Sequence, residues 1–151
     1  MRFRSLIPLL LAGAAFGSVS DDLRAFEGLR LQAYLDTTDH WTVGYGHRCD
    51  KGAAMTAEQA ESALADDIAK AEHGARRAFP SYDSQSLNVQ EVLTMVAFQL
   101  GASGCTKFIR FNQALDARDY KRAASEMMAS RWHKQTPSRV NELAQRIERN
   151  K

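Results

Sequence analysis

The chain has few cysteines, and the two that it has match no metal-ligand spacing. Cys49 and Cys105 lie far apart in sequence, so the sequence offers no cysteine-based metal site. In a reducing compartment both would be small buried apolar residues. In an oxidising compartment they could form a disulfide, and closing so long a loop would stabilise the fold by roughly 3–5 kcal/mol. We expect no metal and no cofactor.

The chain also lacks a strong net charge. Its 20 Lys and Arg residues nearly balance its 18 Asp and Glu residues, which leaves a formal charge of +2 and no strong field for a polyanion over the whole surface. The charge is uneven, because residues 131–151 carry six Lys and Arg residues against two acids, Glu142 and Glu148. This end could attract nucleic acid, anionic lipid or an anionic cell-wall polymer, or it could be an ordinary solvated helix face.

The N-terminus lacks an apolar run of the roughly 20 residues that span a bilayer comfortably. Sixteen uncharged residues, Ser5 to Ser20, follow Arg2 and Arg4, and a basic start before a short apolar run is typical of an export signal. Three interpretations stay open: a cleaved signal peptide, a weak membrane anchor that can later leave the bilayer, and a buried helix of a soluble protein. The first two send the protein out of the cytoplasm. We therefore separate residues 1–20 from a domain over 21–151.

The domain contains no repeats and no low-complexity tracts, and its patterns predict an α+β fold: a small β-hairpin lobe followed by a larger all-helical lobe, with a cleft between them. Alternating Leu29, Leu31, Ala33 and Leu35 indicate a strand with one apolar side. Two capping boxes are expected, Thr56 with Gln59 and Asn88 with Glu91. The expected elements are a short helix capped by Ser20 or Asp21 and stopped at Gly28, strands over 29–36 and 41–47, and helices over 57–79, 89–100, 107–115, 119–130 and from 137.

Two acids and a hydroxyl flank the predicted hairpin. Glu27 would end the short helix, where packing can partly desolvate a carboxyl, and Asp36 would lie in a wetter turn and stay ionised. Thr42, on the returning strand, could hold a water beside Asp36. Two carboxyls in unlike environments suit glycosidic bond cleavage, because one gives a proton to the leaving oxygen and the other handles water. The spacing alone is equally consistent with two solvated carboxylates.

The amino-acid sequence of this segment resembles that of the phage-type lysozyme family, the endolysins of tailed phages. The family pattern is a Glu, eight residues, an Asp, five residues, a Thr, and then Gly-x-Gly-His. It is met in "EGLRLQAYLD" and "TVGYGH" by Glu27, Asp36, Thr42, Gly44, Gly46 and His47. Downstream, "MVAFQLGASG" and "SRWHKQTPSR" are similar to the family's central-helix end and to its stretch before the final helices. The resemblance runs from about Asp22 to Arg146.

This resemblance implies muramidase activity, the hydrolysis of the β-1,4 bond between N-acetylmuramic acid and N-acetylglucosamine in peptidoglycan. Glu27 would be the general acid, and Asp36 with Thr42 would place the attacking water. The family inverts the anomeric carbon, so the two carboxyls should be farther apart than the ~5–5.5 Å of retaining enzymes.

Other residues carry over from the resemblance with supporting roles. His47 would be a structural histidine that pairs with an acid of the helical lobe. Phe98 and Gln99 would line the cleft, and Arg131 and Gln135 would be polar groups near the acid, with Arg131 close to Glu27. The chain departs from the family at Phe111 and Glu126, where relatives contact sugar with small or amide side chains.

The N-terminus is similar to that of the signal-arrest-release endolysins. We therefore expect export to the host periplasm, a tether to the inner membrane through residues 5–20, peptidoglycan glycan strands as the partner, no nucleic acid, and a monomer. The competing classes are a non-catalytic peptidoglycan-binding protein and a membrane-active lysis protein that acts through its C-terminal helix. A lytic transglycosylase needs no second carboxylate, so the presence of Asp36 and Thr42 argues against it.

Overall fold

The computed structural model describes residues 18–150. Most of the predicted export segment lies outside the described residues. The elements, in chain order, are α1 (Val19–Glu27), β1 (Arg30–Leu35), β2 (Trp41–Gly44), β3 (His47–Arg48), α2 (Ala57–Ala78), a 3-10 turn η1 (Tyr82–Ser84), α3 (Leu87–Thr106), α4 (Ile109–Asp116), α5 (Tyr120–Met128), α6 (Arg131–Gln135) and α7 (Pro137–Glu148).

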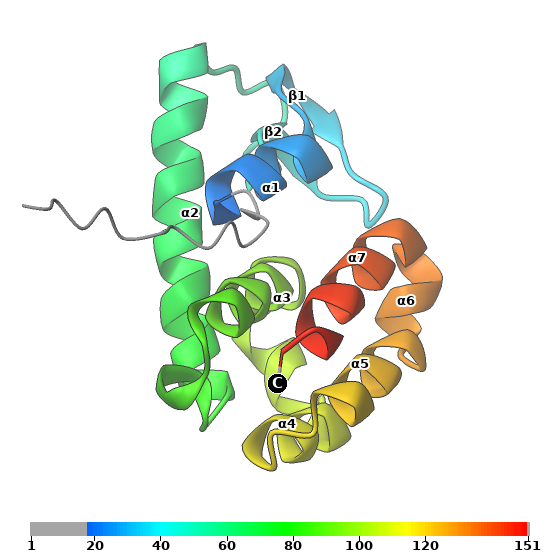
Figure 1. The fold of residues 1–151 in the computed structure, drawn as a ribbon. Coiled ribbons are helices and arrows are strands. Elements are labelled where there is room, and N and C mark those ends of the chain that lie inside the picture. The colour runs from blue at the N-terminus through cyan, green and yellow to red at the C-terminus, as the bar shows by residue number, and fades with distance from the viewer. Residues whose placement is uncertain (1–17, 151) are drawn as a thin grey trace, which may run out of the picture.

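The molecule has the predicted α+β, lysozyme-like architecture. The small sheet and α1 lie together at one end, the helices from α3 to α7 gather at the other, and the long helix α2 runs along one side past both (Figure 1). The hydrophobic core of residues 18–150 lies mainly in the helical lobe and includes Leu23 of α1. The helix that ends at Glu27 is therefore anchored by its own apolar side chain to the larger lobe.

Helix α1 begins earlier than predicted. Its N-cap is Ser18, whose hydroxyl accepts a hydrogen bond from the backbone N–H of Asp21, and not Ser20 or Asp21. Val19 packs against the core, and this burial explains why the helix extends to it. The last residues of the predicted export segment, Ser18 to Ser20, thus belong to the folded domain.

The three strands form an antiparallel sheet in the order β1-β2-β3. The expected second strand is split, because Tyr45 and Gly46 form a turn between β2 and β3. The strand predicted over 29–36 is confirmed as β1, but its apolar side is not buried: Leu29, Leu31 and Leu35 are 44, 40 and 51% exposed. The β1–β2 pairing shifts register between Arg30 and Tyr34, and this irregularity breaks the simple alternation of inward and outward side chains.

Helix α2 begins with the predicted capping box of Thr56 and Gln59. The second predicted capping box is wrong. The N-cap of α3 is Ser86, while the Asn88 amide donates to the Arg146 carbonyl and Glu91 pairs with the Arg146 guanidinium. Both polar side chains are thus used to join α3 to α7.

The central helix α3 is interrupted where the sequence predicted its end. Gly101 has φ 67° and ψ 165°, a conformation that only glycine adopts without strain. The chain resumes helical geometry afterwards and continues to Thr106. The short helix α6 was not predicted. It begins at the N-cap Ser130, whose hydroxyl accepts from the His133 N–H.

The two cysteines are not paired. Cys105 is fully buried in the helical core, and Cys49 follows β3 in the small lobe. Burial raises the pKa of the Cys105 thiol to about 12, so this residue behaves as a buried apolar side chain. Phe111 is likewise fully buried and packs on Phe79 and Phe108, which removes it from the sugar-contacting positions considered above.

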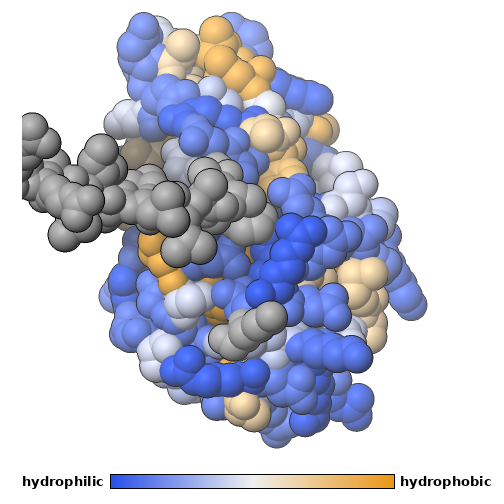
Figure 2. Space-filling view, viewed as in Figure 1, coloured by the Kyte–Doolittle hydropathy of each residue, from blue (hydrophilic) through white to orange (hydrophobic). Residues whose placement is uncertain are grey.

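Within residues 18–150 no single helix is long and apolar enough to cross a membrane, and only α3 and α4 taken together, bent by 103°, pass that test of length and composition. The face of the molecule in Figure 2 is mostly hydrophilic, with its hydrophobic residues in separate small patches.

Candidate active site

Glu27 is the last residue of α1, and Gly28 ends the helix with φ 68° and ψ 155°. Its side chain is 21% exposed. A Cβ built on Gly46 would lie 3.3 Å from the Glu27 carboxylate Oε2, so the turn between β2 and β3 passes close to the acid, where a side chain would be crowded. The carboxylate is thus held between the end of a helix and the sheet.

The other carboxylate oxygen meets an arginine from the far end of the chain. Arg139, in the first turn of α7, places Nη1 2.9 Å from Oε1 of Glu27 and donates from the same nitrogen to Oε1 of Gln99 at 2.6 Å. Its guanidinium also lies 4.7 Å from the centre of the Phe26 ring. Arg139 therefore joins α1, α3 and α7 at the candidate acid.

Asp36 follows β1 and organises the hairpin turn. Its Oδ1 accepts from the Thr38 N–H at 2.8 Å, the Thr38 hydroxyl at 2.8 Å and the His40 N–H at 2.9 Å. These bonds, led by the His40 N–H, lower the pKa of Asp36 below its ordinary value. Within residues 18–150 these donors all meet Oδ1 and none meets Oδ2, which can accept from water. Asp36 is thus the ionised carboxylate that the sequence predicted.

Thr42 is almost fully buried in the central strand β2, with an exposed fraction of 4%. In the sheet, Thr42 is paired with Tyr34 of β1 and with Arg48 of β3. The hydroxyl donates a long bond of 3.5 Å to the Tyr34 carbonyl, which leaves its lone pairs available as acceptors.

His47 pairs with an acid, as predicted, and the partner is Asp67 of α2: Nδ1 lies 2.6 Å from Oδ2. Next to this pair is a cavity of about 520 Å³ where β3, α2 and α3 meet, and Gly46, His47 and Phe98 are among the residues that line it. Because Gly46 also lies close to the Glu27 carboxylate, this cavity adjoins the candidate acid.

The structure places Arg131 differently from the prediction. Arg131 and Gln135 are both exposed residues of α6, and Arg131 lines a small pocket with Trp132 and Lys107. The arginine that contacts Glu27 is Arg139, so the prediction of Arg131 at that carboxylate is wrong. Arg139 is the last residue of the stretch "SRWHKQTPSR", which was the signal that could have found it.

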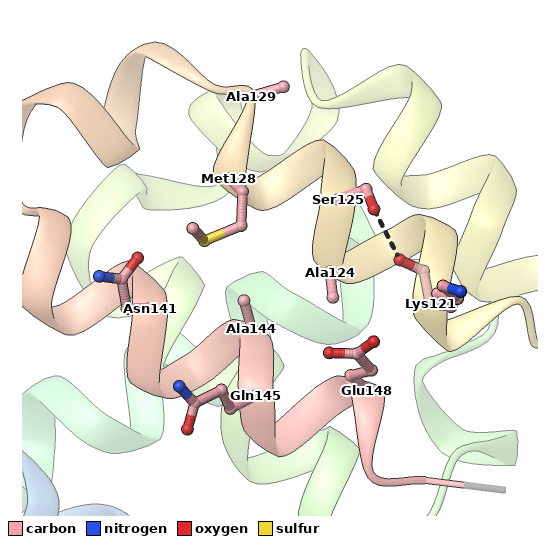
Figure 3. A pocket seen from close by; sticks show the side chains of 9 residues that line it. All are labelled: Lys121, Ala124, Ser125, Met128, Ala129, Asn141, Ala144, Gln145 and Glu148. Atoms are coloured by element: carbon pink, nitrogen blue, oxygen red, sulfur yellow. Dashed lines mark hydrogen bonds between the residues drawn. The ribbon is translucent and has the colours of Figure 1, made fainter.

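A second cavity of about 660 Å³ lies away from these residues, between α5 and α7 (Figure 3). Met128 and Ala124 of α5 face Ala144 of α7 across it. None of the predicted site residues lines this cavity.

Comparison with known sequences decides the family. A profile of the phage lysozyme family matches residues 24–150. The chain belongs to the phage lysozyme family. It is therefore a glycoside hydrolase of the lysozyme type, a class of enzyme that hydrolyses peptidoglycan.

Three relatives of this phage lysozyme differ in how much of their length is shared. A probable T4-type lysozyme of Dictyostelium discoideum is 26% identical over 83% of this chain and 91% of its own length. An endolysin of Acyrthosiphon pisum secondary endosymbiont phage 1 is 32% identical over 74% of this chain and 75% of its own. The pre-baseplate central spike protein of Enterobacteria phage T4 is 26% identical over 83% of this chain, but over only 27% of that protein.

The phage lysozyme fold also holds α1 in place through contacts that the sequence did not reveal. Arg24 of α1 donates through Nη2 to Oε2 of Glu61 at 2.6 Å and through Nε to both of its oxygens, and the Tyr45 hydroxyl donates to Oε1 of the same carboxylate at 2.9 Å. Arg24, and then Tyr45, lower the pKa of Glu61. α1, the β2–β3 turn and α2 are thereby joined at one point, one turn before Glu27.

Proposed function

We propose that this phage lysozyme is an endolysin that hydrolyses the β-1,4 bond between N-acetylmuramic acid and N-acetylglucosamine in peptidoglycan for host cell lysis. The observation that carries the proposal is the placement of Glu27, held by Arg139 and approached by Gly46 beside the cavity at His47 and Phe98. Glu27 is the general acid in this proposal, and Asp36 with Thr42 handles water.

In the proposed reaction the glycosidic oxygen leaves with a proton from Glu27. A water molecule attacks the anomeric carbon, and this water donates a hydrogen bond to Asp36. The turn fixes Oδ1 of Asp36 through three hydrogen bonds, so Oδ2 keeps a defined direction. Gln99 acts through Arg139, and Phe98 offers an apolar wall for a sugar ring. His47 pairs with Asp67, and this pair supports the side of the cavity that the two residues line. Direct substrate contacts by Arg131 and Gln135 stay a prediction.

The variant Glu27→Gln tests the catalytic proposal. It keeps the shape of the side chain and removes the proton donor, so clearing of permeabilised Gram-negative cells should slow by about 10²–10⁴-fold. The matched control is Glu142→Gln, which removes an exposed acid of α7 and should clear at the parental rate. Clearing that survives Glu27→Gln would favour a membrane-active protein, and binding without clearing by the parent would favour a non-catalytic one.

Inversion is tested by the first product. Direct attack of water on a β-linked carbon yields the α-anomer. NMR of the reducing-end proton during early hydrolysis should therefore show the α form before mutarotation. An initial β-anomer would contradict the inverting mechanism and the predicted wide separation of the two carboxyls.

We further propose that residues 5–20 tether the enzyme to the inner membrane until it is released to the host periplasm. Ser18 caps α1 and Val19 packs on the core, so the last residues of the segment have a place in the folded domain. The same residues cannot lie in the bilayer and complete α1 at once. Fractionation of expressing cells should find the protein in membranes before an uncoupler and in the soluble fraction, at full mass, afterwards. A shortened periplasmic form would indicate a cleaved signal peptide instead.

A further inference from the structure

The turn between β1 and β2 places a histidine beside the candidate water-handling acid. Nδ1 of His40 lies 2.9 Å from the hydroxyl oxygen of Thr38, and that hydroxyl lies 2.8 Å from Oδ1 of Asp36. The direct separation of Nδ1 and Oδ1 is 3.9 Å. The three side chains therefore form a chain of contacts from the imidazole through the hydroxyl to the carboxylate, which the chemistry proposed above does not use.

The backbone of this turn brings residue 40 back to residue 36. The Asp36 N–H donates to the His40 carbonyl at 2.9 Å, and the His40 N–H donates to Oδ1 of Asp36 at 2.9 Å. Between them Asp39 has a φ of 61°, a left-handed conformation that aspartate adopts more readily than most residues. Because these bonds are made by the backbone, a change of the His40 side chain leaves the turn closed.

The hydrogens in this chain of contacts can be assigned by counting donors. Oδ1 of Asp36 accepts from the backbone N–H groups of Thr38 and His40, so this oxygen acts as an acceptor. The single hydrogen of the Thr38 hydroxyl must then lie between Oγ1 and Oδ1. Oγ1 can meet Nδ1 only as an acceptor, and the hydrogen of that contact therefore belongs to His40.

We propose that His40 donates through Nδ1 to Thr38, and that these two side chains are positioning residues for the Asp36 carboxylate. This inference rests on the proposed function, in which Asp36 accepts a hydrogen bond from the attacking water. A hydroxyl alone can rotate its hydrogen toward solvent. A donor on its oxygen commits that hydrogen to Asp36 and strengthens the bond cooperatively. The relay thereby fixes the direction in which Oδ2 meets the water.

The first test removes each group of the relay and then restores it. Thr38→Val keeps the shape of the side chain without the hydroxyl, so kcat on purified peptidoglycan should fall about 10-fold with KM unchanged. Thr38→Ser restores the hydroxyl and should recover most of the rate. His40→Leu should cause a smaller loss, and His40→Asn, whose amide can donate from near the position of Nδ1, should recover part of it. The matched control is Thr37→Val, at an exposed position of the same turn, which should keep the parental rate.

The second test asks whether His40 acts through Thr38. In a Thr38→Val background, His40→Leu should cause no further loss of kcat, because the relay is already broken. Additive losses would overturn the relay. Parental kcat in Thr38→Val, or an equal loss in the Thr37→Val control, would overturn it as well.

The third test needs no activity, so it separates this inference from the proposed function. Proton–nitrogen NMR of the neutral ring should show the hydrogen of His40 on Nδ1, and Thr38→Val should lower the fraction of that form. The neutral ring is required because the imidazolium has a hydrogen on both nitrogens. A bare Nδ1 in the parent would overturn the relay, whereas a parent with the expected spectrum that does not hydrolyse peptidoglycan would contradict the proposed function alone.

Discussion

Arg139 lies in the first turn of α7, where the positive end of the helix dipole disfavours a cation. Its partners compensate for this position, since the guanidinium contacts the Glu27 carboxylate and the Gln99 side-chain oxygen. A residue placed against the local preference of its helix is typical of a functional site. Arg139 thus orients the candidate acid.

Replacing Arg139 by Gln should lower kcat by about 10-fold to 10²-fold, because the Glu27 carboxylate loses the group that holds its direction. Arg139→Lys, which keeps the charge without the fork, should recover part of the rate. Hydrolysis rates on purified peptidoglycan measure both, with Arg149→Gln, at the C-cap of α7, as the charge-matched control. Equal losses in the Gln and Lys variants would indicate a packing role only.

Asp36 makes the stability of the hairpin depend on pH. Its pKa lies below the ordinary 3.8 because the His40 and Thr38 groups donate to the ionised form. The ionised carboxylate therefore stabilises the folded state at pH values above 3.8, and this contribution is lost as the pH falls through the lower folded-state pKa.

Asp36→Asn should consequently be less stable than the parent near pH 6, and the difference in free energy of unfolding should shrink below pH 3.8. Urea unfolding of both proteins between pH 2.5 and 7 measures this difference in free energy of unfolding. A difference that stays constant across this range would show that the carboxylate charge does not support the turn.

At the residue scale, the sequence predicted the two acids but not the arginine. Glu27 and Asp36 lie close together in sequence around one hairpin, so local spacing carries their signal. Arg139 reaches Glu27 only through the packing of α7 against the rest of the fold. Local patterns cannot distinguish it from Arg131, eight positions earlier.

At the scale of elements, Gly28 determines the position of Glu27 at the end of α1. It terminates α1 with φ 68° and ψ 155°, and an L-residue in this region is strained by about 1–3 kcal/mol. Although a Cβ there would meet nothing within 4 Å, the backbone conformation is the obstacle.

Gly28→Ala should therefore lower the free energy of unfolding by about 1–3 kcal/mol and reduce activity more than stability alone explains, since it moves Glu27. Gly74→Ala is the matched control, because Gly74 lies inside α2 and its added Cβ would meet Ala102 Cβ at an ordinary 3.6 Å. The control should gain about 0.5–1 kcal/mol. Chemical denaturation measures the free energy of unfolding of both variants. An unchanged value for Gly28→Ala would refute the predicted backbone strain.

Elements with strong local signals were predicted well, and those set by tertiary contacts were not. The capping box of α2 and the proline at the start of α7 mark their helices directly. The N-cap of α3 was misplaced because Asn88 and Glu91 are recruited by Arg146, a partner 58 and 55 positions away. The same limit explains the exposed leucines of β1, since a register shift in pairing is not visible in one strand.

For the whole molecule, Arg146 joins α1 and α3 to α7 through two ion pairs. It is 2% exposed and pairs with Asp22 of α1 at 2.5 Å and with Glu91 of α3 at 3.2 Å. Burial raises the pKa of Glu91, and the positive charge of Arg146 opposes this rise. Breaking a buried ion pair from one side is costly because the remaining charge stays buried.

Arg146→Met should lower the free energy of unfolding by about 3–5 kcal/mol at pH 7. The loss should be smaller at acidic pH, because burial raises the pKa of Glu91 and the charge of Arg146 no longer opposes that rise. The triple variant with Asp22→Asn and Glu91→Gln should recover part of the stability at pH 7. Thermal unfolding at both pH values tests this, and a loss independent of pH would attribute the effect to packing.

The pair between Asp22 and Arg146 spans 124 positions of the chain. This separation determines when the pair can form during translation. A ribosome releases Glu27 early and α7 late, so for most of translation the acid has neither its arginine nor the anchor of its helix. Contacts of such long range form only after the intervening chain has been ordered. Incomplete chains therefore carry the candidate acid without its oriented setting until α7 has been made.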